Sequence, residues 1–534
     1  MKSRLKHFMA GCLAAIMLLS VTSCGSSSSA GSSSGSSSSA VAAIAAADEP
    51  QKGGTMIFGL SNEPKTLAPY AENGYAQKQI VYSIYRNLFS TDINGESVPG
   101  LCKDYTVSED NLTWTFYLVD AKFQNGDPVT AEDVKFTMEY IRDNDDLGAF
   151  LTANFKKYIK EVNVIDDKTV EVITTEPCAV LKSWLGSFYA GILSKSWTET
   201  HDLTTDPMGA GPFKFVSWER GSSITLERFD DCYEGAPYLD GIEFDFYLDE
   251  NARINALKTG VVDLIDYVSS QHFASIESSD DLVMDKANGP FMFLVLDNNY
   301  KPLDDPKVRL AIAYAINRQD VIDMAFDGEG EAMYGTAVTA MMDGYSEKYD
   351  NYYTYDVEKA KELLAEAGYP DGFDLTIGCS SQYKFNENTA VAIQANLKEI
   401  GINVTLEASD WATFYAKHLD NGFAASVNGV ATYYSDIDWL SYLFSTDGSF
   451  NRADYSNAEV DALFAQARSE LDSDKRAELY GQLQQILLDE APWVNLMWRV
   501  QGYAHNKRLH GFVELPNGQF VMSALTFGQC WLEQ

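Results

Sequence analysis

Three short strings in this sequence imitate the motifs of penicillin-recognising serine enzymes. They are Ser381-x-x-Lys384, the Tyr-Ser-Asn string at residues 455–457 and the Lys-Thr-Gly string at residues 258–260. Those enzymes place Lys-Thr-Gly last in the chain, on a strand beside the nucleophilic serine. Here it precedes Ser381 by more than a hundred residues. A secreted serine acyl-transferase or hydrolase is therefore a remote alternative.

Other residues that could do chemistry also lack the necessary context. A Gly-x-Ser-x-Gly string at residues 31–35 lies within a Ser/Gly stretch, with no strand before it or helix after it. The histidines show no H-x-x-x-H or H-E-x-x-H spacing, so no metal-ligand set is indicated. The sequence also contains no phosphate-binding loop. We expect a protein that is not an enzyme and needs no cofactor or metal.

Cysteine usage indicates neither a zinc site nor a disulfide framework. Five cysteines lie beyond residue 24, widely spaced and without a C-x-x-C pair. A single bridge stays open as an alternative. The five are Cys102, Cys178, Cys232, Cys379 and Cys530.

The charge balance excludes several partners. The chain has 77 Asp and Glu against 40 Lys and Arg, giving a formal net charge of −37. So acidic a body repels phosphate backbones and anionic lipid surfaces. We therefore expect no nucleic-acid partner, whereas cationic or zwitterionic ligands remain acceptable. The alternative is that the acidity serves solubility alone.

The N-terminus predicts export and lipid anchoring. A basic start with Lys2, Arg4 and Lys6 precedes an apolar run at residues 8–19, which is typical of a signal peptide and too short to span a bilayer. Small residues then lead into Cys24, and the sequence at this point resembles a bacterial lipobox. Residues 1–24 are thus predicted to be a lipoprotein signal peptide, with Cys24 diacylated as a palmitate-type anchor. Ordinary secretion is the alternative.

Residues 25–49 are predicted to be a flexible tether. Residues 25–40 consist of Ser, Gly and Ala alone, a composition with nothing to bury and no stiffness. A coil of this length reaches about 25 to 30 Å, enough to hold a folded body clear of lipid headgroups. The expected location is the outer face of a bacterial cytoplasmic membrane, and the long spacer favours a bacterium with a single membrane.

The remainder predicts mixed strands and helices. Apolar and polar residues alternate over residues 113–118, as in a half-buried strand. Helix starts are indicated at Thr130, at Asp305 before Pro306, and at Ser456, each followed by apolar residues at helical spacing. A chain of 534 residues exceeds the size of one hydrophobic core. The pattern predicts an α/β protein of two or more domains.

Several blocks of the sequence occur in the order of a known family. The most specific block, at residues 112–134, reads LTWTFYLVDAKFQNGDPVTAEDV. Further blocks lie at residues 209–215, 302–318, 355–368, 456–461 and 472–492. Together they resemble the peptide-type solute-binding proteins of ABC importers, solute-binding protein family 5, and the similarity runs from about Gly53 to Pro492.

This resemblance implies a two-lobed periplasmic-binding-protein-like (type II) fold with a discontinuous first lobe. Lobe I would comprise residues 50–285 and 500–534, with an extra subdomain at about 68–190. Lobe II would comprise residues 286–499. Ligands of such proteins lie between the lobes, and hinge closure around the ligand would be recognised by the permease.

The family resemblance also implies the partners. A monomer is expected to capture a small peptide or peptide-like solute and deliver it to ABC transporter permease subunits, while its lipid anchor holds it at the membrane. A nickel chelate, another metallophore or an oligosaccharide is the alternative ligand within the same fold.

Family members bind the α-ammonium of the peptide through an aspartate that lies shortly before an acidic-Pro turn. If Asp436 and Ile437 take the place of that turn, the ammonium-binding position falls on Tyr433, which cannot supply the full charge of a carboxylate. A shift of the alignment brings Asp436 into the role, so both residues stay candidates. Asp436 could instead be a loop cap, as could Asp438.

Aromatic side chains complete the predicted ligand site. Trp411 follows Asp410, directly after a strand predicted at residues 402–406, where family members present aromatic walls to the ligand. Tyr434 is the second aromatic candidate. Such faces stack against side chains, sugars or planar ligands. The alternative for both is packing in a core or between lobes.

Overall fold

The computed structural model describes residues 49–70, 74–94, 96–144, 147, 149–340, 342, 344–430, 436–515 and 520–534. The predicted signal peptide, Cys24 and residues 25–48 of the predicted tether lie outside them. Within the described ranges, no helix is both long and apolar enough to cross a membrane. Lobe I and lobe II below denote the residues predicted above, and their boundaries remain a proposal.

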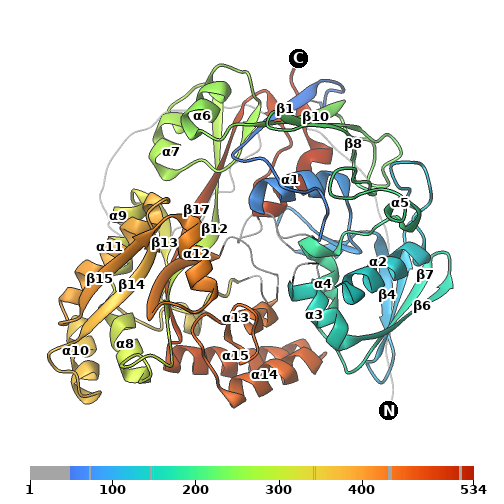
Figure 1. Ribbon diagram of the computed structural model, residues 1–534. Coiled ribbons are helices and arrows are strands. Elements are labelled where there is room, and N and C mark those ends of the chain that lie inside the picture. The colour runs from blue at the N-terminus through green and yellow to red at the C-terminus, as the bar shows by residue number, and fades with distance from the viewer. Residues whose placement is uncertain are drawn as a thin grey trace, which may run out of the picture. The chain divides into compact units, whose positions relative to one another are not determined.

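A single eleven-stranded sheet runs through both predicted lobes (Figure 1). Its order is β15-β14-β16-β12-β17-β11-β1-β10-β9-β8, and β13 also pairs with β17. In lobe I, β1 pairs in parallel with β10 and β11. The lobe I strands are β1 (Thr55–Leu60), β8 (Phe213–Glu219), β9 (Ser223–Arg228), β10 (Gly241–Phe246) and β11 (Leu264–Ile265).

In lobe II, β14 pairs in parallel with both β15 and β16. The lobe II strands are β13 (Gly330–Ala332), β14 (Asp374–Ser380), β15 (Asn403–Ser409) and β16 (Ala425–Val430). The strand predicted at residues 402–406 is thus found as β15.

Two long strands join these halves of the sheet. β12 (Leu282–Leu296) and β17 (Trp493–Asn506) pair antiparallel over nearly their whole length. Figure 1 shows them side by side, with α6 and α7 near one end and β14 and β15 near the other. The predicted crossings between lobes, at residues 285/286 and 499/500, therefore fall within two hydrogen-bonded strands.

The remaining strands of the described residues form three small sheets. The largest has the order β4-β5-β7-β6, and β5 alternates half-buried with buried side chains as predicted. Its strands are β4 (Cys102–Val107), β5 (Thr113–Leu118), β6 (Ile159–Asp166) and β7 (Thr169–Thr174). The two-stranded sheets are β2 (Phe89–Thr91) with β3 (Ser97–Pro99), and β18 (Leu509–His510) with β19 (Trp531–Leu532).

Helix starts follow the sequence signals closely. Thr130 caps α2, and its backbone N–H donates to the Asp133 carboxylate at 3.0 Å. Asp305 caps α8 with Pro306 at the first helical position, as predicted. The start predicted at Ser456 is one residue early, because the side chain of Asn457 accepts the hydrogen bonds that cap α14.

The helices of lobe I are α1 (Gly74–Ile84), α2 (Ala131–Asp143), α3 (Ala149–Tyr158), α4 (Leu181–Gly186), α5 (Lys195–Thr198), α6 (Glu250–Lys258) and α7 (Ser270–Glu277), with the 3₁₀ turns η1 (Phe188–Ala190) and η4 (Phe520–Gln529).

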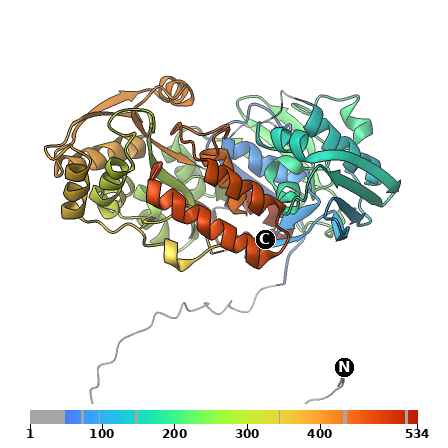
Figure 2. The same ribbon diagram turned by 90° about the horizontal axis from the view of Figure 1, so that it is seen from below.

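The helices of lobe II are α8 (Pro306–Ala315), α9 (Arg318–Phe326), α10 (Val357–Glu366), α11 (Lys384–Lys398), α12 (Trp411–Leu419), α13 (Ser441–Phe444), α14 (Ala458–Ser469) and α15 (Ser473–Glu490), with the 3₁₀ turns η2 (Glu347–Tyr349) and η3 (Ile437–Leu440). Figure 2 shows α14 and α15 packed along each other.

The hydrophobic core joins the two ends of the described chain. Phe58 of β1 packs against Phe244 of β10 at 5.6 Å and against Phe527 of η4 at 5.8 Å between ring centroids. All three rings are buried. Burial of large aromatic surface on both segments holds the C-terminal residues against the first strand.

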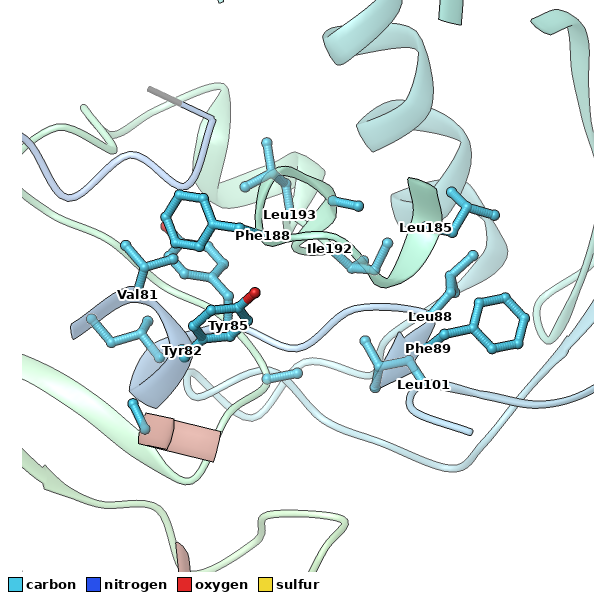
Figure 3. Packing of buried hydrophobic residues seen from close by; sticks show 14 of the residues in the cluster. Val81, Tyr82, Tyr85, Leu88, Phe89, Leu101, Leu185, Phe188, Ile192 and Leu193 are labelled. Atoms are coloured by element: carbon cyan, nitrogen blue, oxygen red, sulfur yellow. The ribbon is translucent and has the colours of Figure 1, made fainter. Parts of the chain in front are cut away.

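A second part of the same core lies where α1 meets the segment after α4. Figure 3 shows Val81 and Tyr82 of α1, and Tyr85 directly after it, close to Phe188 and Leu193. The rings of Tyr82 and Phe188 meet edge to face, with centroids 5.4 Å apart. This packing attaches the segment with the β4-β5-β7-β6 sheet to the rest of lobe I.

Candidate functional site

The register of the long strand pair is interrupted at two places, between Asn288 and Phe291 and between Met292 and Phe293. At the first of these, a β-bulge, Gly289 and Pro290 stand opposite the single residue Arg499 of β17. Proline has no N–H to donate, and within sheets it is found at edges and bulges. Bulges bend a strand and redirect the neighbouring side chain. The local break in pairing thus falls beside the one charged side chain at this level of β17.

Arg499 lies in a cluster of side chains from separate elements. Its guanidinium lies 4.3 Å from the centre of the Phe385 ring, and its Nη2 is 3.4 Å from the Tyr267 hydroxyl. The ring of Tyr383 packs against Phe385 at 5.7 Å and against Trp411 at 5.3 Å. We call these five residues the Arg499 cluster. It joins Tyr267 of lobe I to aromatic rings of lobe II.

Tyr267 is held by a buried polar network. It has a positive φ of 50°, which is uncommon for a bulky residue and costs backbone energy. Its carbonyl accepts a hydrogen bond from Arg253 at 3.2 Å, and Arg253 lies 3.6 Å from the carboxylate of Asp266. Ser61 donates to Asp266 through both its backbone N–H and its hydroxyl. Burial raises the pKa of Asp266 to about 6 despite these partners.

Trp411 belongs to the Arg499 cluster and is half-buried. It occupies the first position of α12, after the cap Asp410, and its ring stacks on Tyr415 at 5.0 Å. Its backbone N–H donates to Gln382 at 3.2 Å. The tryptophan thus packs against its own helix on one side and against Tyr383 on the other. Its role toward a ligand stays a prediction.

Asp436 caps the short turn η3. Its Oδ1 accepts from the backbone N–H of Asp438 at 2.8 Å and from the Tyr480 hydroxyl at 2.7 Å. Burial, followed by repulsion from Asp438, raises the pKa of Asp436 to about 6. The carboxylate therefore has a capping role in the described chain. The other candidates of this stretch, Tyr433 and Tyr434, lie outside the described residues.

Asp438 forms a buried ion pair within lobe II with Arg468, which also contacts lobe I. Arg468 of α14 lies 2.7 Å from its Oδ1 and also donates to the Tyr158 hydroxyl of α3 at 2.7 Å. The Arg468 carbonyl accepts from the backbone N–H of Ala179 at 2.7 Å. The Asp438 side chain is 2% exposed and that of Arg468 is 9% exposed. Lobe II is thus linked to the small-sheet segment of lobe I far along the chain from β12.

The serine-enzyme strings have structural partners. Lys384 pairs with Glu387 at 2.6 Å, and Lys258 donates to Ser275 at 3.4 Å. No group of three or more His, Cys, Asp and Glu side chains suited to a metal occurs in the part of the chain that the structure describes. The five cysteines beyond residue 24 are all buried and unbridged.

The comparison with protein families decides the class. Residues 96–452 match the model of the bacterial extracellular solute-binding proteins, family 5. The chain belongs to this family. The predicted resemblance is confirmed, and so is the α/β periplasmic-binding-protein-like fold.

The similarity of this family 5 protein to known relatives extends over most of its chain. The glutathione-binding protein GsiB of Salmonella typhi is 30% identical over 483 residues, covering 87% of this chain and 93% of that protein. Among solved structures, AgaA of A. tumefaciens R10 in complex with agropinic acid is 36% identical with a TM-score of 0.79, covering 90% of this chain and 99% of that one.

A further solved relative is the periplasmic binding protein DppA of Helicobacter pylori, associated with an ABC transporter and in complex with peptide STSA. It is 26% identical with a TM-score of 0.77, covering 91% of this chain and 99% of that one. These relatives are solute-binding proteins, which confirms that the chain is a solute-binding protein of the ABC importer type and not an enzyme.

Sequence reasoning missed Arg499, Tyr267 and Arg468. None belongs to a motif with a fixed spacing, and their partners are distant along the chain: Tyr267 lies 232 residues from Arg499, and Tyr158 lies 310 residues from Arg468. The available signal was an arginine within an apolar segment, Trp498-Arg499-Val500 of the family 5 protein. An arginine in such a strand demands a partner.

The buried ion pair predicts a strong coupling between two substitutions. Arg468→Met leaves the Asp438 carboxylate buried without its cation, and we expect a loss of about 3 to 5 kcal/mol in the free energy of unfolding. Adding Asp438→Asn to that variant should recover about 2 kcal/mol, because no buried charge then remains. Urea unfolding followed by fluorescence measures both values. Lys361→Met at the exposed Lys361–Glu358 pair should cost less than about 1 kcal/mol. Equal losses of unfolding free energy in Arg468→Met and Lys361→Met would contradict a strong interaction in the buried pair.

The raised pKa of Asp436 predicts a stability difference that depends on pH. A folded-state pKa of about 6, above the ordinary value, means that the contribution of Asp436 is complete at low pH and is lost as the pH rises through 6. Asp436→Asn keeps an oxygen acceptor without the charge. It should match the parent at pH 4 and be more stable by roughly 1 to 2 kcal/mol at pH 7.5. Thermal unfolding at both pH values tests this, with the exposed Asp447→Asn as control. A variant that is less stable at every pH would show that the cap needs the charge.

Proposed function

We propose that this protein captures a peptide-like solute between its two lobes and delivers it to the permease of an ABC importer. The observation that carries the proposal is the Arg499 cluster. A chain of contacts through Arg499 and Phe385 connects Tyr267 of lobe I with Tyr383 and Trp411 of lobe II, at the level where β12 and β17 pass between the lobes. Small-ligand sites form preferentially at such domain interfaces.

Relatives favour a peptide-like ligand. GsiB is named for glutathione, and the DppA structure contains the peptide STSA. AgaA binds agropinic acid, which keeps the ligand class wider than peptides. We propose Trp411, Tyr433, Tyr434 and Asp436 as ligand contacts of this chain. A nickel chelate, another metallophore or an oligosaccharide would use the same fold.

Capture requires an open form that closes around the solute. A ligand that contacts both lobes binds the closed form more tightly and so shifts the population toward it. The bulge at Gly289 and Pro290 interrupts the strand pairing at the crossing, where hinge rotation needs it. The contacts of Arg468 with Tyr158 and Ala179 are suited to the closed form, since they join the predicted lobes. The permease would bind that form.

Ligand release from the purified protein tests the proposal. We expect native mass spectrometry of the protein without its tether, purified from rich medium, to show a bound mass that denaturation releases as peptides. Asp436→Asn should carry at least about tenfold less peptide if this carboxylate binds the ammonium, since about 1.4 kcal/mol corresponds to a factor of ten. The exposed Asp447→Asn variant should keep its load.

Two results would decide against parts of this proposal. Release of a metal chelate or a glycan would replace the peptide while keeping solute capture. An unchanged radius of gyration in X-ray scattering, with ligand binding shown by calorimetry, would contradict closure of the lobes.

We further propose that Cys24 carries the lipid that holds the protein at the outer face of the cytoplasmic membrane. Residues 25–49 would then act as the tether, in a monomeric protein. In a single-membrane bacterial host, Cys24→Ala should move the protein from the membrane fraction to the medium, because no diacylated residue remains. Cys12→Ala, within the apolar run of the predicted signal peptide, is the matched control and should stay membrane-bound. Membrane retention of the Cys24→Ala variant would contradict the anchor.

A further inference from the structure

Arg499 differs from every other arginine in the described residues. Each of the others lies within ion-pair distance of a carboxylate or donates to a main-chain carbonyl, as Arg468 does to Asp438 and Arg318 to the carbonyl of Ile316. Arg499 forms no ion pair with any described residue. Its hydrogen-bond acceptor there is the Tyr267 hydroxyl, at a long 3.4 Å. In a chain with 77 acidic residues, this lack of an acidic partner is unexpected.

The guanidinium of Arg499 is also partly withdrawn from water. Its Nε is buried and has no hydrogen-bond partner within the described ranges. A buried donor without an acceptor destabilises the fold, and the cost is larger for a charged group. An acceptor supplied by a ligand would remove that cost. An arginine at position 499 is thus unfavourable for the stability of the fold but suitable for binding a ligand.

The surroundings of Arg499 favour binding of a planar anion. Stacking on Phe385 holds the guanidinium by its face and leaves its N–H edges available. The Tyr267 hydroxyl accepts from Arg499 and can donate its own proton to an incoming oxygen. Arg253 fixes the strained backbone of Tyr267, so this hydroxyl is positioned before any ligand arrives.

We propose that Arg499 and Tyr267 bind a carboxylate of the transported solute. Arginine and carboxylate form paired, charge-assisted hydrogen bonds whose geometry is specific. The Arg499 cluster contains one cation, which balances one carboxylate and not a doubly charged phosphate. Because the net charge of −37 disfavours anions at long range, the affinity for this group must come from the local pair. This inference rests on the proposed function and names the solute group that the site selects.

Two peptide libraries test the carboxylate directly. The protein is freed of solute by unfolding and refolding, and then incubated with an equimolar tetrapeptide library carrying free C-terminal carboxylates, or with the same library as C-terminal amides. Retained peptides are measured by mass spectrometry after gel filtration. We expect the amide library to be retained at least tenfold less than the free acids.

Variants assign the effect to Arg499. Arg499→Gln should reduce retention of the free acids to the level of the amides, and Arg499→Lys should give an intermediate value, since lysine keeps the charge but not the planar fork. Tyr267→Phe removes one hydroxyl and should lower retention roughly threefold to tenfold. The matched control is Arg220→Gln. Arg220 also stacks on an aromatic ring, Trp218, but lies beside Glu63, and its variant should retain peptides as the parent does.

Each outcome decides a different statement. Equal retention of acids and amides, or full retention by Arg499→Gln, would overturn the carboxylate site while the peptide function stands. Retention of neither library by the parent protein would overturn the peptide function and the carboxylate site with it. Tyr267→Phe keeps the test valid if Arg499→Gln does not fold, because full retention of the free acids by this variant would contradict the shared site.

Discussion

The antiparallel pairing of β12 with β17 is the constraint on which both halves of the protein depend. Each strand contributes its hydrogen bonds to both predicted lobes, and buried backbone groups that lose their partners are costly. Neither strand can therefore leave the sheet without exposing the cores on both sides. Movement between the proposed lobes would use a place where the pairing is already irregular, and the register shift at Gly289 and Pro290 is the one that lies opposite Arg499.

That position also determines where a ligand can contact both lobes. Arg499 stands opposite the bulge, and its neighbours come from the segment after β11 and from the start of α11. A solute bound there would contact residues that move relative to one another when the strand pair bends. Because the solute would lie beside the hinge, its binding energy would favour the closed arrangement of the lobes.

Polar groups in the interior have two different roles. Arg253 with Asp266, and Arg468 with Asp438, are ion pairs whose charges compensate each other, and they hold a loop and a contact between lobes. Arg499 lacks such compensation among the described residues. Burying an uncompensated group is unfavourable unless a partner is supplied. The contrast distinguishes these ion-paired side chains, which serve the fold, from Arg499, whose surroundings are suited to a solute.

The family was predictable from ordered blocks of sequence, and the mixed α/β fold, the cap at Asp305 and the alternating strand at residues 113–118 were predictable because they depend on neighbours in the chain. The resemblance to the family also made Trp411 a candidate ligand contact, which stays a prediction. The folded structure was needed to connect Trp411 with Arg499 through Tyr383 and Phe385, to assign Asp436 to a cap, and to join Arg468 to Tyr158. These relations are contacts between residues up to 310 positions apart, and neither periodicity nor motif spacing carries information over such distances.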